Sequence, residues 1–276
     1  MPTTTRRLLI AFAHPDDESF GLGAFIGRAV SDGVDVYYVC ATNGDVGTVS
    51  PELMNGYNSV KELRLAELEC AAKLLGFRDV LLLGYKDSGM MGAAENQDPE
   101  CLWYHWSHRP AEVTRRMVEV IRTIQPQVVI TFNKYGGYGH PDHIAIQAAT
   151  TEAISLAADA GYVTPGLAPY TPQKLYYNTF PTFFLRAAVT IMRLRGKDPR
   201  KVGRNQDIDL LKIFDYIEPS HARVDVSAYI GLWDQASACH VSQGGGRSGF
   251  TPRWLRKLFG YKQGFTRIIP ALGTAA

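Results

Sequence analysis

The chain has 276 residues, of which 46% are hydrophobic and 20% are charged, and its formal net charge is +2. This composition is typical of a globular protein with a sizeable buried core, built as one large domain or as a domain with an appended subdomain. The small net charge excludes the strongly basic class of nucleic-acid-binding proteins and gives no reason to expect an acidic partner.

Targeting signals and cysteines bear on the compartment. We find no stretch with the layout of a signal peptide or the length of a membrane span, which favours the cytoplasm. The four cysteines are widely spaced and include no CxxC pair: Cys40, Cys70, Cys101 and Cys239. Such spacing favours buried reduced thiols over a disulfide framework. Nothing in the sequence indicates an oligomeric state.

Short apolar runs alternate with helical patterns along most of the chain. We expect buried strands at residues 8–13, 34–41, 80–83 and 128–132, with a less regular one at 174–180. Helical patterns occupy residues 20–31, 59–75, 112–124 and 144–160. This alternation predicts a Rossmann-like α/β fold, with a mostly parallel sheet and helices on both faces. Ligands of such sheets bind just beyond the carboxyl ends of the strands.

The later part of the sequence has less regular patterns. We expect residues 1–180 to form the Rossmann-like core and residues 181–276 to form a smaller cap-like or C-terminal portion packed on that core. A basic stretch at 193–204 is interpreted as a solvated surface. The basic and aromatic tail at 251–267 is expected to be a final helix on the domain, although a helix on a membrane surface is conceivable.

A His-Pro-Asp tripeptide follows two of the expected strands. The motif AHPDDE follows the first strand and GHPDH follows the fourth, and together they supply His14, Asp16, Asp17, Glu18, His140, Asp142 and His143. Imidazoles and a carboxylate from separate loops commonly hold a catalytic zinc ion. Helix capping would explain the carboxylates of either motif alone. Their occurrence at two strand ends of one sheet favours a metal site.

These motifs resemble the PIG-L/LmbE family of zinc-dependent de-N-acetylases. That family includes deacetylases of N-acetylglucosaminyl-inositol compounds and an amidase of mycothiol conjugates. The similarity covers most of the chain and includes KELRLAELE, YKDSGM, FNKYGGYGHPDH and ACHVSQ. The resemblance implies a zinc site formed by His14, Asp17 and His143. It further implies Asp16 as general base, a protonated His140 at the oxyanion, and Asp142 behind an imidazole.

The resemblance for Arg64, and the positions of Asp87 after a strand and of Tyr138 before His140, suggest a substrate pocket, and each residue has an alternative explanation. Arg64 would reach a sugar hydroxyl or phosphate, or it forms only a surface ion pair with Glu67. Asp87 would contact the ligand, or it only shapes a turn. Tyr138 would donate its hydroxyl to the oxyanion, or it is a packed loop aromatic. His105 and His108 follow no strand end, so a pocket wall or the surface is expected for both.

The implied reaction is hydrolysis of an N-acetyl group on a glucosamine-type substrate. A metal generates hydroxide at neutral pH and polarises the amide, while Asp16 carries the proton to the departing nitrogen. Zn²⁺ is the expected cofactor, and Fe²⁺ could replace it in the cell. The partner is a small amino-sugar conjugate. The alternatives are an amidase of a larger thiol conjugate and a non-catalytic sugar- or nucleotide-binding module. The presence of Asp16 argues against the binding module, because binding alone does not need a general base.

Overall fold

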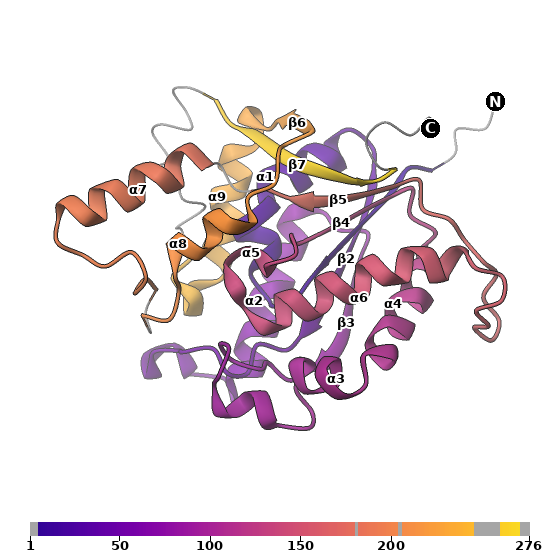
Figure 1. The fold of residues 1–276 in the computed structure, drawn as a ribbon, viewed down its shortest axis with the longest axis horizontal. Coiled ribbons are helices and arrows are strands. Elements are labelled where there is room, and N and C mark those ends of the chain that lie inside the picture. The colour runs from indigo at the N-terminus through magenta and orange to yellow at the C-terminus, as the bar shows by residue number, and fades with distance from the viewer. Residues whose placement is uncertain (1–4, 180–181, 204–205, 246–259, 271–276) are drawn as a thin grey trace.

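A computed structural model describes residues 5–179, 182–203, 206–245 and 260–270. These residues form a seven-stranded sheet in the order β3-β2-β1-β4-β5-β7-β6, with helices on both of its faces (Figure 1). The first five strands in this order are parallel, whereas β7 is antiparallel to both β5 and β6. The expected Rossmann-like α/β class and its mostly parallel sheet are therefore confirmed.

The strands are β1 (Arg7–Phe12), β2 (Asp35–Thr42), β3 (Asp79–Tyr85), β4 (Val128–Thr131), β5 (Lys174–Asn178), β6 (Ala222–Asp225) and β7 (Lys262–Ile269). The helices are α1 (Asp17–Ser31), α2 (Val60–Leu75), α3 (Leu102–His108), α4 (Pro110–Ile124), α5 (Gly136–Gly139), α6 (Pro141–Ala158), α7 (Thr182–Leu194), α8 (Leu210–Ile213) and α9 (Ile230–Cys239). Single 3₁₀ turns span Pro51–Met54, Ala94–Gln97, Phe214–Tyr216, Ser227–Tyr229 and Val241–Gln243.

Burial explains why the central strands are continuous apolar runs. Helices α4 and α6 pack together on one face, and α9 packs with α1 and α2 on the other. Leu9, Ile10 and Ala11 of β1 are therefore fully buried. Full burial of one such aliphatic side chain stabilises the fold by about 1.5–3 kcal/mol. The edge strand β3 is half exposed instead, with Leu82 49% accessible.

Helix α2 shows how local signals set the element boundaries. The side chain of Ser59 accepts a hydrogen bond from the backbone N–H of Glu62 and caps the first turn. Gly76 ends the helix in the left-handed conformation, which a residue without a Cβ adopts at little cost. The helix predicted at 59–75 therefore matches the structure.

Two expectations that involve the C-terminal part of the chain are wrong. Cys70 of α2 and Cys239 of α9 form a disulfide, although all four cysteines were expected to be reduced. They are 169 residues apart, and only the packing of α9 on α2 brings their Cα atoms to 5.8 Å. Cys40 and Cys101 are free and buried, as expected. The expected final helix at 251–267 is also wrong from Lys262 onward, where β7 begins; residues 251–259 lie outside the described residues.

The strand order explains where the site lies. Strand β1 has β4 on one side and β2 on the other, so the loops that follow these strands meet at one edge of the sheet. This is the position at which open α/β sheets bind ligands. Both His-Pro-Asp motifs start there, one after β1 and one between α5 and α6.

Candidate metal centre and active site

Ring nitrogens and carboxylate oxygens from the two motifs converge in the structure. Nδ1 of His14 lies 2.9 Å from Nε2 of His143. Asp17 places Oδ2 at 3.6 Å from the same His14 nitrogen and Oδ1 at 3.4 Å from the same His143 nitrogen. These three side chains are buried or nearly so. They bring two imidazole nitrogens and the two carboxylate oxygens of Asp17 close together.

The spacing between these nitrogen and oxygen atoms fits a small divalent ion. A tetrahedral zinc ion with bonds of about 2.0–2.2 Å separates its ligand atoms by about 3.3–3.5 Å, and the three distances lie around that value. Zinc accepts this mixture of imidazole nitrogen and carboxylate oxygen. Three protein ligands would leave a further position for water and substrate, as in catalytic rather than structural sites.

The tautomer of His143 leaves a ring nitrogen available to a metal ion. Nδ1 of His143 lies 2.9 Å from the carbonyl oxygen of Gly136 and donates its proton there, which leaves Nε2 with a free lone pair. Burial lowers the pKa of His143 to about 4, so the ring is neutral. A Cβ at Gly136 would lie 2.5 Å from that of His143, so only glycine permits this approach.

The opposite nitrogen of His14 faces a carboxylate that is already held. Nε2 of His14 lies 3.2 Å from Oδ2 of Asp142, and the backbone N–H of Ser88 donates to the same oxygen at 2.9 Å. The hydroxyl of Ser88 donates to the other oxygen of Asp142. Asp142 is fully buried. It is thus placed to orient His14, as carboxylates behind metal-bound histidines do.

A second set of possible ligands shares His14 with the first. His14, Asp87, His140 and Asp142 each offer an atom within 4.8 Å of the others. Asp142 is occupied by Ser88 and His14, however, and Oδ1 of Asp87 accepts from the N–H of Gly89 at 2.9 Å. In the set of His14, Asp17 and His143, Oδ2 of Asp17 accepts the backbone N–H groups of Ala13 and His14, whereas no described hydrogen bond engages Oδ1 of Asp17, which faces Nε2 of His143. Both sets therefore offer ligand atoms for a metal.

The negative charge of the carboxylates in the centre also favours binding of a cation. Burial opposes ionisation of Asp17, but nearby His143 and His14 hold the pKa of this carboxyl well below its usual range. Burial is likewise outweighed at Asp87, whose pKa His14 and His140 lower. Burial disfavours a charge on His14, yet Asp87 and Asp142 raise its pKa well above the ordinary value. The ionised carboxylates of Asp17 and Asp87 favour positive charge in this centre, and a divalent ion would supply it.

Asp16 stands beside this centre in a strained conformation. Its φ is +133°, a value that residues with a side chain rarely adopt and that is found at functional sites. Burial raises the pKa of Asp16 to about 7, against the opposing effect of Arg64. The backbone N–H of Asp16 donates to Glu18 at 3.0 Å. A carboxyl with a pKa near neutrality can both take up and return a proton.

Arg64 is engaged within the protein rather than directed at the solvent. Its Nη2 lies 2.7 Å from the carbonyl oxygen of Pro15 and 3.1 Å from Oδ2 of Asp16. Its Nη1 donates to the carbonyl oxygen of Gly44 at 3.0 Å and lies 3.8 Å from Asp87. The residue is only 3% exposed, although it lines the cavity. Its contacts hold Asp16 in place, and the surface ion pair with Glu67 is absent among the described ion pairs.

His140 differs from the expectation that it is protonated. Burial, together with His14 and His143, lowers the pKa of His140 well below its ordinary value. Its Nδ1 accepts the backbone N–H of Asp142 at 3.2 Å, so the neutral ring carries its proton on Nε2. A neutral imidazole with this tautomer is still a hydrogen-bond donor. The expected cationic oxyanion group is therefore replaced by a neutral donor.

A cavity of about 680 Å³ opens over these groups. His14, Asp16, Arg64, Asp87, Tyr138 and His140 all line it. The ring of Tyr138 meets the ring of His143 edge-on, with centroids 5.0 Å apart. Gly203, Asp207 and Ile208, from the segment after α7, form another part of the wall. All of the site residues predicted from the sequence are thus gathered in or beside one cavity.

Sequence reasoning missed the polar pairs that fix the wall of this cavity. Ser242 donates its backbone N–H and its hydroxyl to Glu67, at 2.7 and 2.6 Å. The next residue, Gln243, lines the cavity. His240 lies 2.7 Å from Glu18, and both are fully buried. The ACHVSQ motif marked this region, but its partners are more than 170 residues away in sequence.

His105 and His108 lie outside the site. His105 is 3.3 Å from Glu112, and its ring is tilted against that of Tyr85 with centroids 4.9 Å apart. His108 is exposed and bonds to the carbonyl oxygen of Tyr104. Neither lines the catalytic cavity. The expectation of a surface position is confirmed for His108.

The fold and this centre define a Rossmann-like α/β protein with a histidine–carboxylate site suited to a catalytic divalent metal. The chain belongs to the PIG-L family, because the sequence profile described as GlcNAc-PI de-N-acetylase matches residues 9–154. A 1D-myo-inositol 2-acetamido-2-deoxy-alpha-D-glucopyranoside deacetylase from Streptomyces griseus is 36% identical over 86% of this chain and 75% of its own length. The family resemblance predicted from the motifs is confirmed.

Two solved structures share the fold. The N,N'-diacetylchitobiose deacetylase of Pyrococcus horikoshii superposes with a TM-score of 0.62 and 20% identity, over 95% of this chain and 84% of its own. GalB, a 4-carboxy-2-hydroxymuconate hydratase from Pseudomonas putida KT2440, gives a TM-score of 0.64 and 16% identity, over 99% and 100%. Because the second protein is a hydratase, the fold by itself does not select the reaction.

Proposed function

We propose that the protein is a zinc-dependent N-deacetylase that removes the acetyl group from the glucosamine unit of a small inositol-type conjugate. The observation that carries this proposal is the convergence of His14, Asp17 and His143 at the cavity that His14 and Asp16 line. The similarity to inositol-glucosaminide deacetylases supports the substrate class. Among the described residues no helix is both long and apolar enough to cross a membrane; we propose a cytoplasmic enzyme.

A zinc ion, or a ferrous ion in its place, would be held by His14, Asp17 and His143 and would supply Lewis-acid activation of water and of the amide carbonyl. Asp16 is placed to take the proton of the attacking water and to deliver it to the departing nitrogen. Arg64 holds the carboxylate of Asp16 in the orientation that this transfer needs. Asp142 keeps the ring of His14 in a single tautomer.

His140 and Tyr138 are the groups placed to stabilise the oxyanion. The Nε2–H of His140 and the phenol of Tyr138 line the same cavity as Asp16. Burial raises the pKa of Tyr138 far above its ordinary value, so the phenol keeps its proton and can donate it in a hydrogen bond. Donors fixed at the place where charge develops lower the barrier without reorganisation.

Comparative hydrolysis tests this proposal. N-acetylglucosamine, its inositol conjugate, chito-oligosaccharides and acylated thiol conjugates are incubated with the purified protein, and released acetate is measured. We expect the inositol conjugate to be the best substrate, and we expect a chelator to abolish activity that added Zn²⁺ restores. Preferential cleavage of a thiol conjugate would assign the protein to the amidases instead. Activity that survives complete metal removal would contradict the metal-dependent mechanism.

A further inference from the structure

The end of helix α9 is fixed to the helices beside the catalytic cavity. Helix α9 packs on α1 and on α2 (Figure 1). Its last residue, Cys239, forms the disulfide with Cys70 of α2. Shortly after it, Ser242 donates two hydrogen bonds to Glu67 of the same helix. His240 lies between these two attachments and is fully buried, so its backbone is held in place from both sides.

The imidazole of His240 has one polar partner among the described residues, the carboxylate of Glu18. Nε2 of His240 lies 2.7 Å from Oε1 of Glu18. Because a carboxylate accepts, the ring carries a proton on Nε2 and donates it there. Nδ1 is buried and has no hydrogen-bond partner within the part of the chain that the structure describes. The single polar contact of this side chain is therefore made to α1.

Glu18 connects His240 to the backbone of the proposed base. Oε2 of Glu18 accepts the N–H of Asp16 at 3.0 Å. Oε1 accepts the hydroxyl of Ser19 at 2.6 Å as well as the proton of His240. Glu18 is fully buried, so its carboxylate depends on these protein donors. Donors on both oxygens fix the orientation of the carboxylate, and the N–H of Asp16 thereby has a fixed acceptor.

The backbone of Asp16 needs this acceptor because its conformation is unfavourable. A φ of +133° with a ψ of −25° is rare for a residue with a side chain, and it persists only where the surroundings impose it. Loss of the acceptor would leave the N–H unpaired and allow φ to relax, which would turn the carboxylate away from its place. A displacement of about 1 Å near the reacting atoms can lower a rate about 10²-fold.

We propose that His240 is a positioning residue for the deacetylation: it orients Glu18, and Glu18 holds Asp16 in the conformation in which its carboxylate acts as base. This inference rests on the proposed function, because it takes Asp16 as the base. His240 does not line the catalytic cavity, so its effect on the reaction passes through Glu18. A role in packing alone would leave the turnover of the folded protein unchanged, which separates the two explanations.

The candidate metal ligands should not depend on His240. Oδ2 of Asp17 accepts the backbone N–H groups of Ala13 and His14. These bonds hold the ligand loop and do not involve Glu18. Loss of His240 should therefore lower the rate and leave the metal in place.

His240→Leu and His240→Gln test the proposal in the whole chain. Leucine fills the site without a donor, whereas glutamine places a side-chain N–H near the position of Nε2. We expect His240→Leu to lose about 10–100-fold in kcat with KM and metal content unchanged, and His240→Gln to retain most of the turnover. Because glutamine carries no charge, His240→Gln should still be less stable than the wild type, so rate and stability separate in this variant. If His240→Leu does not fold, His240→Asn replaces it, because the shorter amide does not reach Glu18.

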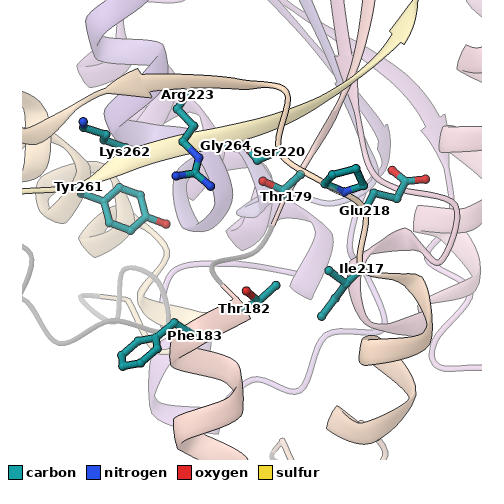
Figure 2. A pocket seen from close by; sticks show the side chains of 11 residues that line it. Thr179, Thr182, Phe183, Ile217, Glu218, Ser220, Arg223, Tyr261, Lys262 and Gly264 are labelled. Atoms are coloured by element: carbon teal, nitrogen blue, oxygen red, sulfur yellow. The ribbon is translucent and has the colours of Figure 1, made fainter. Parts of the chain in front are cut away.

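His221→Leu is the matched control, because it makes the same substitution at an exposed histidine of the C-terminal part. In sequence His221 lies between Ser220 and Arg223, which Figure 2 shows at a second cavity of about 550 Å³. That cavity shares no lining residue with the catalytic one. We expect the kcat and KM of the wild type. Thermal unfolding midpoints above the assay temperature verify that each variant is folded.

Hydrogen exchange of the Asp16 amide tests the same contacts without turnover. It should be slow in the wild type and in His240→Gln and faster in His240→Leu, because only the last loses the donor that orients Glu18. If the wild type hydrolyses no N-acetyl substrate, the proposed function fails, whereas this measurement still tests the link from His240 to Asp16. The proposal is overturned by a folded His240→Leu with the kcat and amide exchange of the wild type, by a defect confined to KM, by loss of metal, or by an equal defect in His240→Gln.

Discussion

Arg64 and Asp16 form a buried ion pair in which Nη2 of the guanidinium lies 3.1 Å from Oδ2 of the carboxylate. The same nitrogen donates to the carbonyl oxygen of Pro15. Arg64 therefore contacts both the side chain of Asp16, the proposed base, and the backbone of the residue before it. The family resemblance had suggested an arginine that reaches the sugar, with a surface ion pair to Glu67 as the alternative. The structure instead favours a residue that acts through Asp16, and this changes the expected behaviour of its variants.

Replacing Arg64 with Gln should lower turnover of the sugar conjugate and of a small amide alike, by about tenfold or more. Burial raises the pKa of Asp16 to about 7, and Arg64 is the group that opposes this rise. Loss of Arg64 raises the pKa further, so the rising limb of the rate–pH profile moves to higher pH, because the base works only when ionised. Profiles of kcat/KM against pH measure this shift.

The matched control is Lys61→Gln, which removes one positive charge from an exposed position of the same helix. It should leave the profile in place. A loss of sugar preference in Arg64→Gln, with the small amide hydrolysed as before, would restore Arg64 to substrate recognition.

Asp16 and Asp17 should separate catalysis from metal binding. Asp16→Asn should retain about one metal ion per chain and lose about 10²–10⁴-fold in turnover, because the centre is intact but the base is lost. Asp17→Asn should lose metal as well, since its two oxygens lie 3.4 and 3.6 Å from the facing nitrogens of His143 and His14. Elemental analysis after dialysis measures both. Equal metal contents in the two variants would disprove this division.

His140 should act as a neutral donor. Burial and the neighbouring histidines keep its pKa well below the ordinary value, so it carries no charge to lose at alkaline pH. We therefore expect no fall in rate at high pH that depends on His140. His140→Ala should reduce kcat by about 10²–10³-fold with little change in KM, because the donor meets charge that exists only in the transition state. An alkaline limb present in the wild type and missing in a His140→Gln variant would show that the ring is cationic.

The sequence allowed the parallel core and its loops to be predicted for physical reasons. Continuous apolar runs identify strands buried on both faces, and the motifs at their carboxyl ends place His14 and His143 at one edge. Strands β6 and β7 were missed because their pairing is antiparallel and joins residues far apart in the chain. Lys262 and Gln263 also lack the apolar run that marks a central strand.

The protonation state of His140 could not be read from sequence, because it depends on tertiary burial and on His14 and His143 nearby. The role of Arg64 was likewise set by contacts that form only on folding. The HPD motifs identify the atoms of the centre, whereas the electrostatics between them come from the packing of loops that are distant in sequence. The domain boundary at residue 180 stays a prediction.

Glu18 and His240 should govern the pH dependence of stability. The pair is fully buried, with Nε2 of His240 2.7 Å from Oε1 of Glu18. Burial opposes both charges, but His240 lowers the pKa of Glu18 below 4.5 and Glu18 raises the pKa of His240 above 6.5. The contribution of Glu18 to the free energy of unfolding is complete above pH 4.5 and is lost as pH falls through its lowered pKa. The contribution of His240 to the same free energy is complete below pH 6.5 and is lost as pH rises through its raised pKa.

The pair should therefore stabilise the fold most between pH 4.5 and 6.5. His240→Gln leaves a buried carboxylate without its cation and should cost about 3–5 kcal/mol in the free energy of unfolding. Glu18→Gln/His240→Gln should recover part of that loss, because neither buried charge then remains. Urea unfolding of the oxidised protein across this pH range measures both effects. If His240→Gln were as stable as the wild type at every pH, the imidazole would be an uncharged packing group, and the ion pair would contribute nothing to the fold.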